Sequence, residues 1–206
     1  MNHSKWMLGY AFFLSLAGCA TTPPSPLPAN TPKAITSTEN KSLRNDPAAI
    51  QNWDLKGMIA IRNTHDAWSA HWQWNQQNQN YVINLIGPLG SNSIQLTGSP
   101  GKVLLETSDG KKTQSASPET LLEKQLGWRL PVSNLYYWVR GLPVPGIPAQ
   151  KQLDASQHIS VLAQQGWRVE YLRYSRVGQT DLPAKMNLNN AALNVKILIS
   201  QWQLEK

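Results

Sequence analysis

Residues 67–98 read AWSAHWQWNQQNQNYVINLIGPLGSNSIQLTG, and this stretch decides the fold class. Apolar residues alternate with polar ones along most of it. A period of two is typical of β-strands that have one buried face and one solvated face. The stretch therefore predicts consecutive β-strands joined by turns. The alternating apolar positions are Trp68, Ala70, Trp72, Trp74, Tyr81, Ile83, Leu85, Ile94 and Leu96.

The turn between the last two of these strands is Gly87-Pro88-Leu89-Gly90-Ser91. Glycine, proline and serine are ordinary turn residues. A leucine at the tip is different, because the turn would hold its side chain out to water. One exposed leucine is common on protein surfaces and needs no purpose. Pro88-Leu89-Gly90 is nevertheless a candidate for contact with a membrane.

The remaining chain shows the same alternation, interrupted by a helical segment. Ser117 and Pro118 form a typical helix start, with Leu121, Leu122 and Leu126 as its apolar stripe and Pro131 as its end. Two more helices are predicted at 133–139 and, short, at 47–52. Together these elements predict an antiparallel meander of roughly ten strands, curled into a complete or partial barrel. The other predicted strands cover 53–61, 102–107, 159–163, 167–174, 185–189 and 193–202.

The composition bounds the class of protein. The chain has 206 residues, of which 41% are hydrophobic and 15% charged, enough for one domain with a core plus extensions. The net charge of +7 favours an acidic partner or an anionic surface. No basic run is longer than Lys111-Lys112, which argues against nucleic acid as the partner.

The first 18 residues have the pattern of a secretory signal peptide. Lys5 precedes an apolar run, residues 7–16, that is too short to span a bilayer. The run ends in Leu16-Ala17-Gly18-Cys19, which resembles the bacterial lipobox, where lipid is attached to the cysteine. The alternative is a secreted protein with a spare thiol. Cys19 is the single cysteine, so an internal disulfide framework is excluded.

Two or three acyl chains on Cys19 would anchor the chain firmly to a membrane. By resemblance to enterobacterial sorting, Ala20 rather than Asp after the cysteine indicates the periplasmic face of the outer membrane. Residues 19–45 contain many prolines and are predicted to form an extended tether. The β-domain is expected to occupy residues 46–206.

The sequence offers no recognisable catalytic chemistry. It contains no G-x-S-x-G elbow, no P-loop and no G-x-G-x-x-G motif. His65 falls in a predicted turn and His71 on a polar strand face, and neither has a carboxylate at the spacing of a zinc site. We therefore expect no enzyme activity, no metal and no cofactor beyond the lipid on Cys19.

The inward-facing apolar residues form either a packed core or the wall of an apolar cavity, and both use the same residue types. The helices offer Leu122, Leu126 and Trp138 as a lid over such a cavity. The candidate cavity residues are Leu55, Ile59, Ile61, Trp72, Trp74, Ile83, Leu85, Ile94, Leu96, Leu122, Trp138, Val169, Tyr171 and Ile197.

Several motifs in combination resemble the LolB family of outer-membrane lipoproteins, over residues 53–204. The family usually has asparagine where Gly87 stands. The motifs are the lipobox at Cys19, Trp53-x-Leu55-x-Gly57, Trp72-x-Trp74, the segments 84–91 (NLIGPLGS), 138–143 (WVRGLP) and 183–186 (PAKM), Trp167-x-Val169-x-Tyr171 and Ile199-x-Gln201-Trp202.

The resemblance implies a half-open antiparallel barrel of ten or eleven strands, with two or three helices covering its mouth. Its cavity would accept the acyl chains of lipoproteins from the periplasmic carrier LolA, and the protein, expected to be a monomer, would insert them into the phospholipid of the outer membrane. No ATP is used at this step, so the transfer must be driven by differences in affinity for the same acyl chains. Leu89 matches the family's protruding-loop leucine, which implies a role in membrane insertion.

Two other classes of function stay open at this point. One is a structural or assembly lipoprotein that binds a protein or envelope partner through its outer surface. The other is a lipid-cleaving enzyme built on a lipocalin-like frame.

Overall fold

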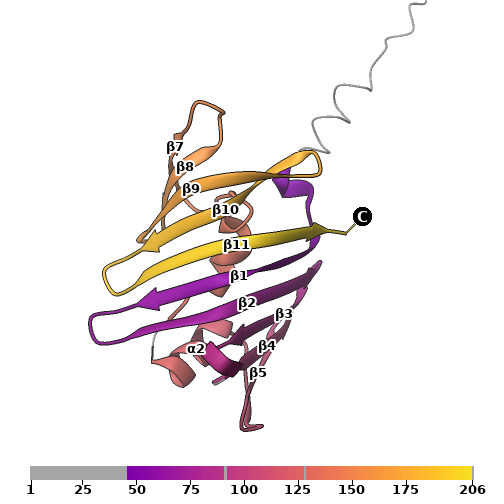
Figure 1. Cartoon of the computed structure of the whole chain (residues 1–206), viewed down its shortest axis with the longest axis vertical. Helices are drawn as coiled ribbons and strands as arrows, with labels where there is room; N and C mark the ends of the chain where they lie inside the picture. The colour runs from indigo at the N-terminus through magenta and orange to yellow at the C-terminus, as the bar shows by residue number, and fades with distance from the viewer. Residues whose placement is uncertain (1–45, 91, 128, 206) are drawn as a thin grey trace, which may run out of the picture. The chain divides into compact units, whose positions relative to one another are not determined.

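The computed structural model describes residues 46–90, 92–127 and 129–205. The predicted signal peptide, the lipid site Cys19 and the tether lie outside these residues. The described residues form one eleven-stranded antiparallel sheet (Figure 1). Its strands are β1 (Asn52–Arg62), β2 (Ala67–Gln77), β3 (Asn80–Ile86), β4 (Ile94–Ser99), β5 (Lys102–Thr107), β6 (Lys112–Ser115), β7 (Gln150–Leu153), β8 (Ile159–Gln164), β9 (Trp167–Val177), β10 (Thr180–Asn189) and β11 (Asn194–Leu204).

The strand order, β6-β5-β4-β3-β2-β1-β11-β10-β9-β8-β7, explains why the sheet is not closed. The chain runs as a meander from β1 to the edge strand β6 and then crosses to the opposite edge strand β7. Helices α2 (Pro118–Leu126) and α3 (Val132–Trp138) make this crossing on one face of the sheet (Figure 1). The return meander ends when β11 pairs with β1. The prediction of a mainly β, unclosed antiparallel barrel with a helical cover is confirmed.

The predicted alternation sets which face of each strand is buried. In β11, Val195, Ile197 and Ile199 are buried on one face, and Leu193, directly before the strand, is buried as well. β1 and β11 also approach unusually closely where their register shifts at Lys56/Gly57. A Cβ atom on Gly57 would lie 1.9 Å from the carbonyl oxygen of Leu198, so only glycine fits there.

Tryptophans fill much of the space beside the central strands. The ring centroid of Trp53 lies 5.1 Å from that of Trp74 and 5.3 Å from that of Trp202, and the Trp72 and Trp74 centroids are 5.7 Å apart. Tilted and edge-on contacts of this kind add to the burial of the rings. These tryptophans therefore pack against one another in the core.

Some predicted boundaries were wrong. Helix α2 ends before Pro131, the residue expected to end it, because Gly127 caps the helix with a left-handed backbone, φ of 77°. The short helix is a three-residue 3-10 turn, η1 (Pro47–Ala49), although Asp46 caps it as expected and accepts from the Ala48 N–H at 2.8 Å. Among the described residues, no helix has the length and apolar character needed to cross a bilayer.

Three strand segments were not predicted: the edge strands β6 and β7 and the start of β10. All four residues of β7 are exposed, so the strand shows no contrast between apolar and polar faces. β10 begins at Thr180, five residues before the predicted start, and it contains Pro183, a residue type that is rare inside strands. The proline is accommodated next to a register shift between Pro183 and Lys185.

Candidate functional site

A cleft of about 980 Å³ lies between the sheet and the helical segment that crosses it. Its volume is at the upper end of the range of roughly 300–1,000 Å³ that is usual for ligand pockets. Its walls come from β2, the β2–β3 turn, β3, the end of β4, β5, η1, both helices and the loop after α3. Twelve of its nineteen lining residues are apolar or aromatic and seven are polar.

The apolar wall is concentrated on the helical side. Val132, Tyr136 and Tyr137 of α3 face Trp74 and Val103 of the sheet across the cleft. Leu142, Pro143 and Pro145 continue this wall beyond α3. The cleft therefore presents an apolar surface to a ligand, with the polar groups of its turns at the edges.

Of the fourteen residues proposed from sequence to line a cavity, Trp74 lines this cleft. The other thirteen are buried in the core: Leu55, Ile59, Ile61, Trp72, Ile83, Leu85, Ile94, Leu96, Leu122, Trp138, Val169, Tyr171 and Ile197. In the proposed lid, Leu122 and Trp138 are buried and Leu126 is half-buried. Direct contact between these core residues and acyl chains stays a prediction.

The two helices are joined at the cleft by Glu119. One of its carboxylate oxygens accepts from the Ser117 hydroxyl at 2.7 Å, and the other accepts from the Ser133 N–H at 2.8 Å. Burial alone would raise the pKa of Glu119, but these hydrogen bonds outweigh it and hold the pKa below its ordinary value. The ionised carboxylate thus connects the start of α2 to the start of α3.

A second set of hydrogen bonds holds the end of α3 and the following loop to the sheet. Gln164 of β8 is buried, and its side-chain oxygen accepts from the Trp138 indole N–H at 3.1 Å and from the Val144 N–H at 2.9 Å. Its side-chain N–H₂ donates to the carbonyls of Val144 and Ile147 at 2.9 and 3.0 Å. All polar groups of this buried amide are therefore used in fixing the cover.

Arg140 is the one charged residue among those that line the cleft. Its guanidinium lies 4.2 Å from the centroid of the Tyr136 ring and donates to the carbonyls of Tyr136 at 3.0 Å and Ile50 at 2.6 Å. Burial lowers the pKa of Arg140, although an arginine stays charged at neutral pH. The contact with Ile50 holds the segment before β1 at the rim of the cleft.

Tyr81 places an unpaired hydroxyl beside the cleft. Its oxygen is buried and has no hydrogen-bond partner among the described residues. Burial, and secondarily the charge of Glu119, raises its pKa. Gly98 makes room for the ring, since a Cβ there would lie 2.1 Å from it.

The loop with the candidate membrane leucine lies away from the cleft. Leu89 is fully exposed and has a left-handed backbone, with φ of 56° and ψ of 23°, inside a turn closed by the Gly90 N–H donating to the Gly87 carbonyl at 3.1 Å. The loop follows the last residue of β3, whereas the cleft reaches the turn before its first. The cleft residue nearest to the loop on this strand is Tyr81, and the five strand residues between them, 82–86, span about 17 Å.

The histidines gather no metal ligands. His65 lies in the β1–β2 turn, where its ring contacts Thr64, and His71 is exposed on β2. Within residues 46–90, 92–127 and 129–205, no three His, Cys, Asp or Glu side chains are grouped as a metal site requires.

Comparison with known proteins identifies the family. The model of the family described as outer membrane lipoprotein LolB matches residues 51–202. An outer-membrane lipoprotein LolB from Pseudomonas fluorescens is 45% identical over 153 residues, covering 74% of this chain and 75% of the relative. Another, from Pseudomonas syringae pv. syringae, is 38% identical and covers 98% of this chain and 97% of its own.

A solved structure supports the fold alone. A DUF1329 family protein from Desulfovibrio piger superposes with a TM-score of 0.51 at 8% identity, covering 82% of this chain and 92% of that one. The family model covers most of the described domain, and the second relative aligns with nearly the whole chain. This chain therefore belongs to the LolB family of outer-membrane lipoproteins.

Proposed function

We propose that the cleft accepts the acyl chains of a lipoprotein delivered by a LolA-type carrier, and that the protein then inserts them into the outer membrane. Membership of the LolB family implies the carrier and lipoproteins as partners. The single observation that supports a role for the cleft is its apolar wall beneath the helical cover. A purely structural lipoprotein acting through its outer surface is not favoured by this membership.

The mixed lining of the cleft suits a receptor that must also release its ligand. Each methylene moved out of water contributes about 0.8 kcal/mol, so an apolar wall retains acyl chains. Seven polar residues on the same cleft keep this burial incomplete. A bilayer buries the same chains more fully, and transfer onward therefore runs downhill without nucleotide hydrolysis.

The loop carrying Leu89 is assigned the contact with the bilayer at the insertion step. Its fully exposed side chain contributes nothing to the core, and its distance from the cleft separates cargo acceptance from membrane contact. We also propose that lipid on Cys19 anchors the chain after removal of residues 1–18, that residues 19–45 act as the tether, and that the protein is a monomer without metal or cofactor.

The test is a transfer assay with the purified chain carrying Cys19→Ala and a complex of acylated lipoprotein with its carrier. Leu142→Asp places a charge on the half-buried cleft wall and should reduce acceptance of cargo at least tenfold. Leu153→Asp, on the exposed strand β7 and outside the cleft, is the matched control and should accept cargo normally. Equal acceptance by the two variants, both verified as folded, would contradict the role of the cleft.

A second variant separates acceptance from insertion. Leu89→Glu should accept cargo nearly as well as the parent chain, because the loop does not line the cleft. Its insertion of cargo into liposomes should fall. Normal insertion by this variant would show that the loop is not the membrane contact.

A further inference from the structure

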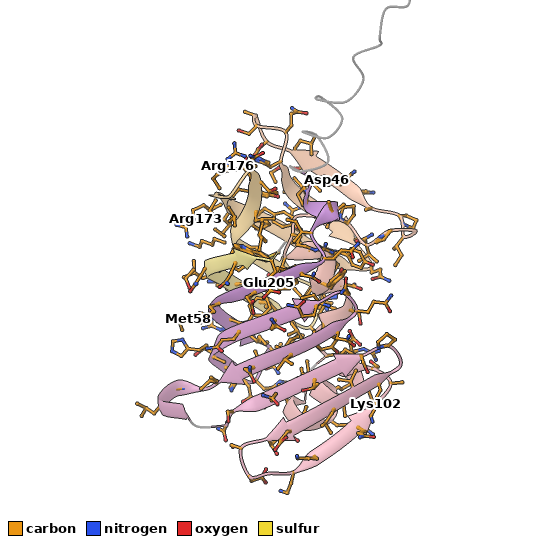
Figure 2. The ribbon with its side chains drawn as sticks, turned by 90° about the vertical axis from the view of Figure 1, so that its right-hand side faces the viewer. Asp46, Met58, Lys102, Arg173, Arg176 and Glu205 are labelled. Carbon is orange, nitrogen blue, oxygen red and sulfur yellow. The ribbon has the colours of Figure 1, made fainter. Side chains whose placement is uncertain are left out.

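Four of the exposed large hydrophobic side chains lie on one side of the sheet, and the fifth, Leu153, is on the edge strand β7. The described residues contain five of them: Met58, Leu89, Leu153, Leu172 and Leu198. Leu198 lies between the buried residues Ile197 and Ile199, and its partner Met58 precedes the buried Ile59, so both point away from the core. Leu172 follows the buried Tyr171 and shares their outer face. The β3–β4 loop projects from this same side, on which Met58 and Arg173 also lie in Figure 2.

Strand register places these residues in one continuous row. Met58 of β1 pairs with Leu198 of β11, Leu198 pairs with Lys185 of β10, and Lys185 pairs with Arg173 of β9. In the other direction Met58 pairs with His71, which pairs with Ile86, the last residue before the Leu89 loop. The row therefore joins an exposed apolar pair to a basic pair at one end and to the loop at the other.

The basic pair has no acidic partner. Lys185 and Arg173 are both exposed and directly opposed, an arrangement of like charges that is unfavourable in a sheet. Neither makes an ion pair with any described residue. The nearby acids are engaged elsewhere, Glu170 with Arg168 at 2.8 Å and Asp181 with Arg176 at 3.5 Å.

More unpaired cations extend along the same face. Lys56 and Arg62 of β1 and Lys196 of β11 are exposed and alternate with buried residues, so they point outward with Met58 and Leu198. None of the three forms an ion pair within the part of the chain that the structure describes. The outer face thus combines an excess of positive charge with exposed aliphatic side chains.

We propose that this outer face, defined by Met58, Leu198, Lys185, Arg173, Lys56 and Lys196, rests on the anionic phospholipid surface of the membrane while the Leu89 loop inserts. Basic residues near an anionic leaflet and apolar side chains at its interface favour the same contact. The helices lie on the opposite face of the sheet, so the cleft stays open to a carrier (Figure 1). The inference rests on the membrane location of the family and not on what the cleft holds.

The test is flotation of the chain carrying Cys19→Ala with vesicles of phosphatidylcholine alone or with 30% phosphatidylglycerol. Each basic residue near an anionic surface contributes about a factor of five to binding. Arg173→Gln/Lys185→Gln should therefore weaken binding to the anionic vesicles about 25-fold. Lys102→Gln/Lys124→Gln removes the same charge away from this face and should bind within about twofold of the parent; Lys102 lies on the other side in Figure 2.

A second pair of substitutions tests the apolar part of the face. Met58→Ser/Leu198→Ser should weaken vesicle binding several-fold even at 0.5 M salt, where the charge contribution is largely screened. All variants should keep the far-UV spectrum of the parent and accept cargo normally, since none lines the cleft.

Two results would overturn the proposal. One is equal vesicle binding by the Arg173/Lys185 and Lys102/Lys124 double variants. The other is unchanged vesicle binding combined with loss of cargo acceptance by the Arg173/Lys185 variant, which would assign the face to an acidic carrier protein instead. Failure of the cleft variant Leu142→Asp to affect acceptance is a separate result and leaves this proposal standing.

Discussion

Leu89→Gly should leave the protein as stable as the parent or more stable, while it weakens membrane binding. The left-handed backbone at Leu89 costs a residue with a Cβ about 1–2 kcal/mol, and glycine removes that cost. The greater freedom of glycine in the unfolded chain destabilises the fold by about 0.5–1 kcal/mol. Since the leucine is fully exposed, no core packing is lost. The net change in the free energy of unfolding is therefore between about 0 and +1.5 kcal/mol.

The same substitution removes the side chain that would enter the bilayer. Burying one leucine contributes about 1.5–3 kcal/mol, so vesicle binding should fall roughly ten- to hundredfold. Urea denaturation measures the first quantity and vesicle flotation the second, both on the chain carrying Cys19→Ala. Leu153→Gly is the control for binding and should float like the parent. A loss of more than 1 kcal/mol of stability, or unchanged flotation, would refute the reasoning.

Three further predictions concern the sheet and the cover. Gly57→Ala should lower the free energy of unfolding, measured by urea denaturation, by about 3 kcal/mol or more, because its Cβ would meet the Leu198 carbonyl. Gly101→Ala is the control: there is open space at this position but φ is +72°, and the substitution should cost about 1 kcal/mol. Glu119→Gln should cost about 1–2 kcal/mol at pH 7 by the same measurement, and an undiminished stability would contradict its role between the helices. Because folding lowers the pKa of Glu119, its ionised carboxylate stabilises the fold above pH 4.5, and this stabilisation is lost as the pH falls through the folded pKa. Below pH 4.5 the stability of Glu119→Gln should therefore fall less steeply than that of the parent. An equally steep fall would contradict this prediction.

The sequence predicted those parts of the fold in which one strand face is buried and the other solvated. The alternation in β1, β2 and β11 was sufficient because every second side chain enters the core. It failed for β7, whose four residues are all exposed, and for the start of β10, where Pro183 lies at a register shift. The crossing from one sheet edge to the other depends on long-range pairing, which local periodicity does not report.

The site was harder to predict than the fold. Inward-facing strand residues were proposed as cavity wall, but in a sheet that carries a helical cover most of them pack in the core. Besides Trp74, the cleft is walled by turn residues such as Asn78 and Gln79 and by the helix residues Tyr136 and Tyr137. These positions have no common period. The adjacent tyrosines Tyr136 and Tyr137, which are not among the buried residues of α3, are a signal that could have indicated the helical wall.

The most direct test of the central claim is photocrosslinking from inside the cleft. A benzophenone side chain introduced in place of Tyr137, which lines the cleft, should crosslink to the acyl chains of a lipoprotein once the carrier has delivered it. The same group in place of Leu153 should give no crosslink. Efficient delivery of cargo without a crosslink from position 137, or with equal crosslinking from position 153, would contradict the account.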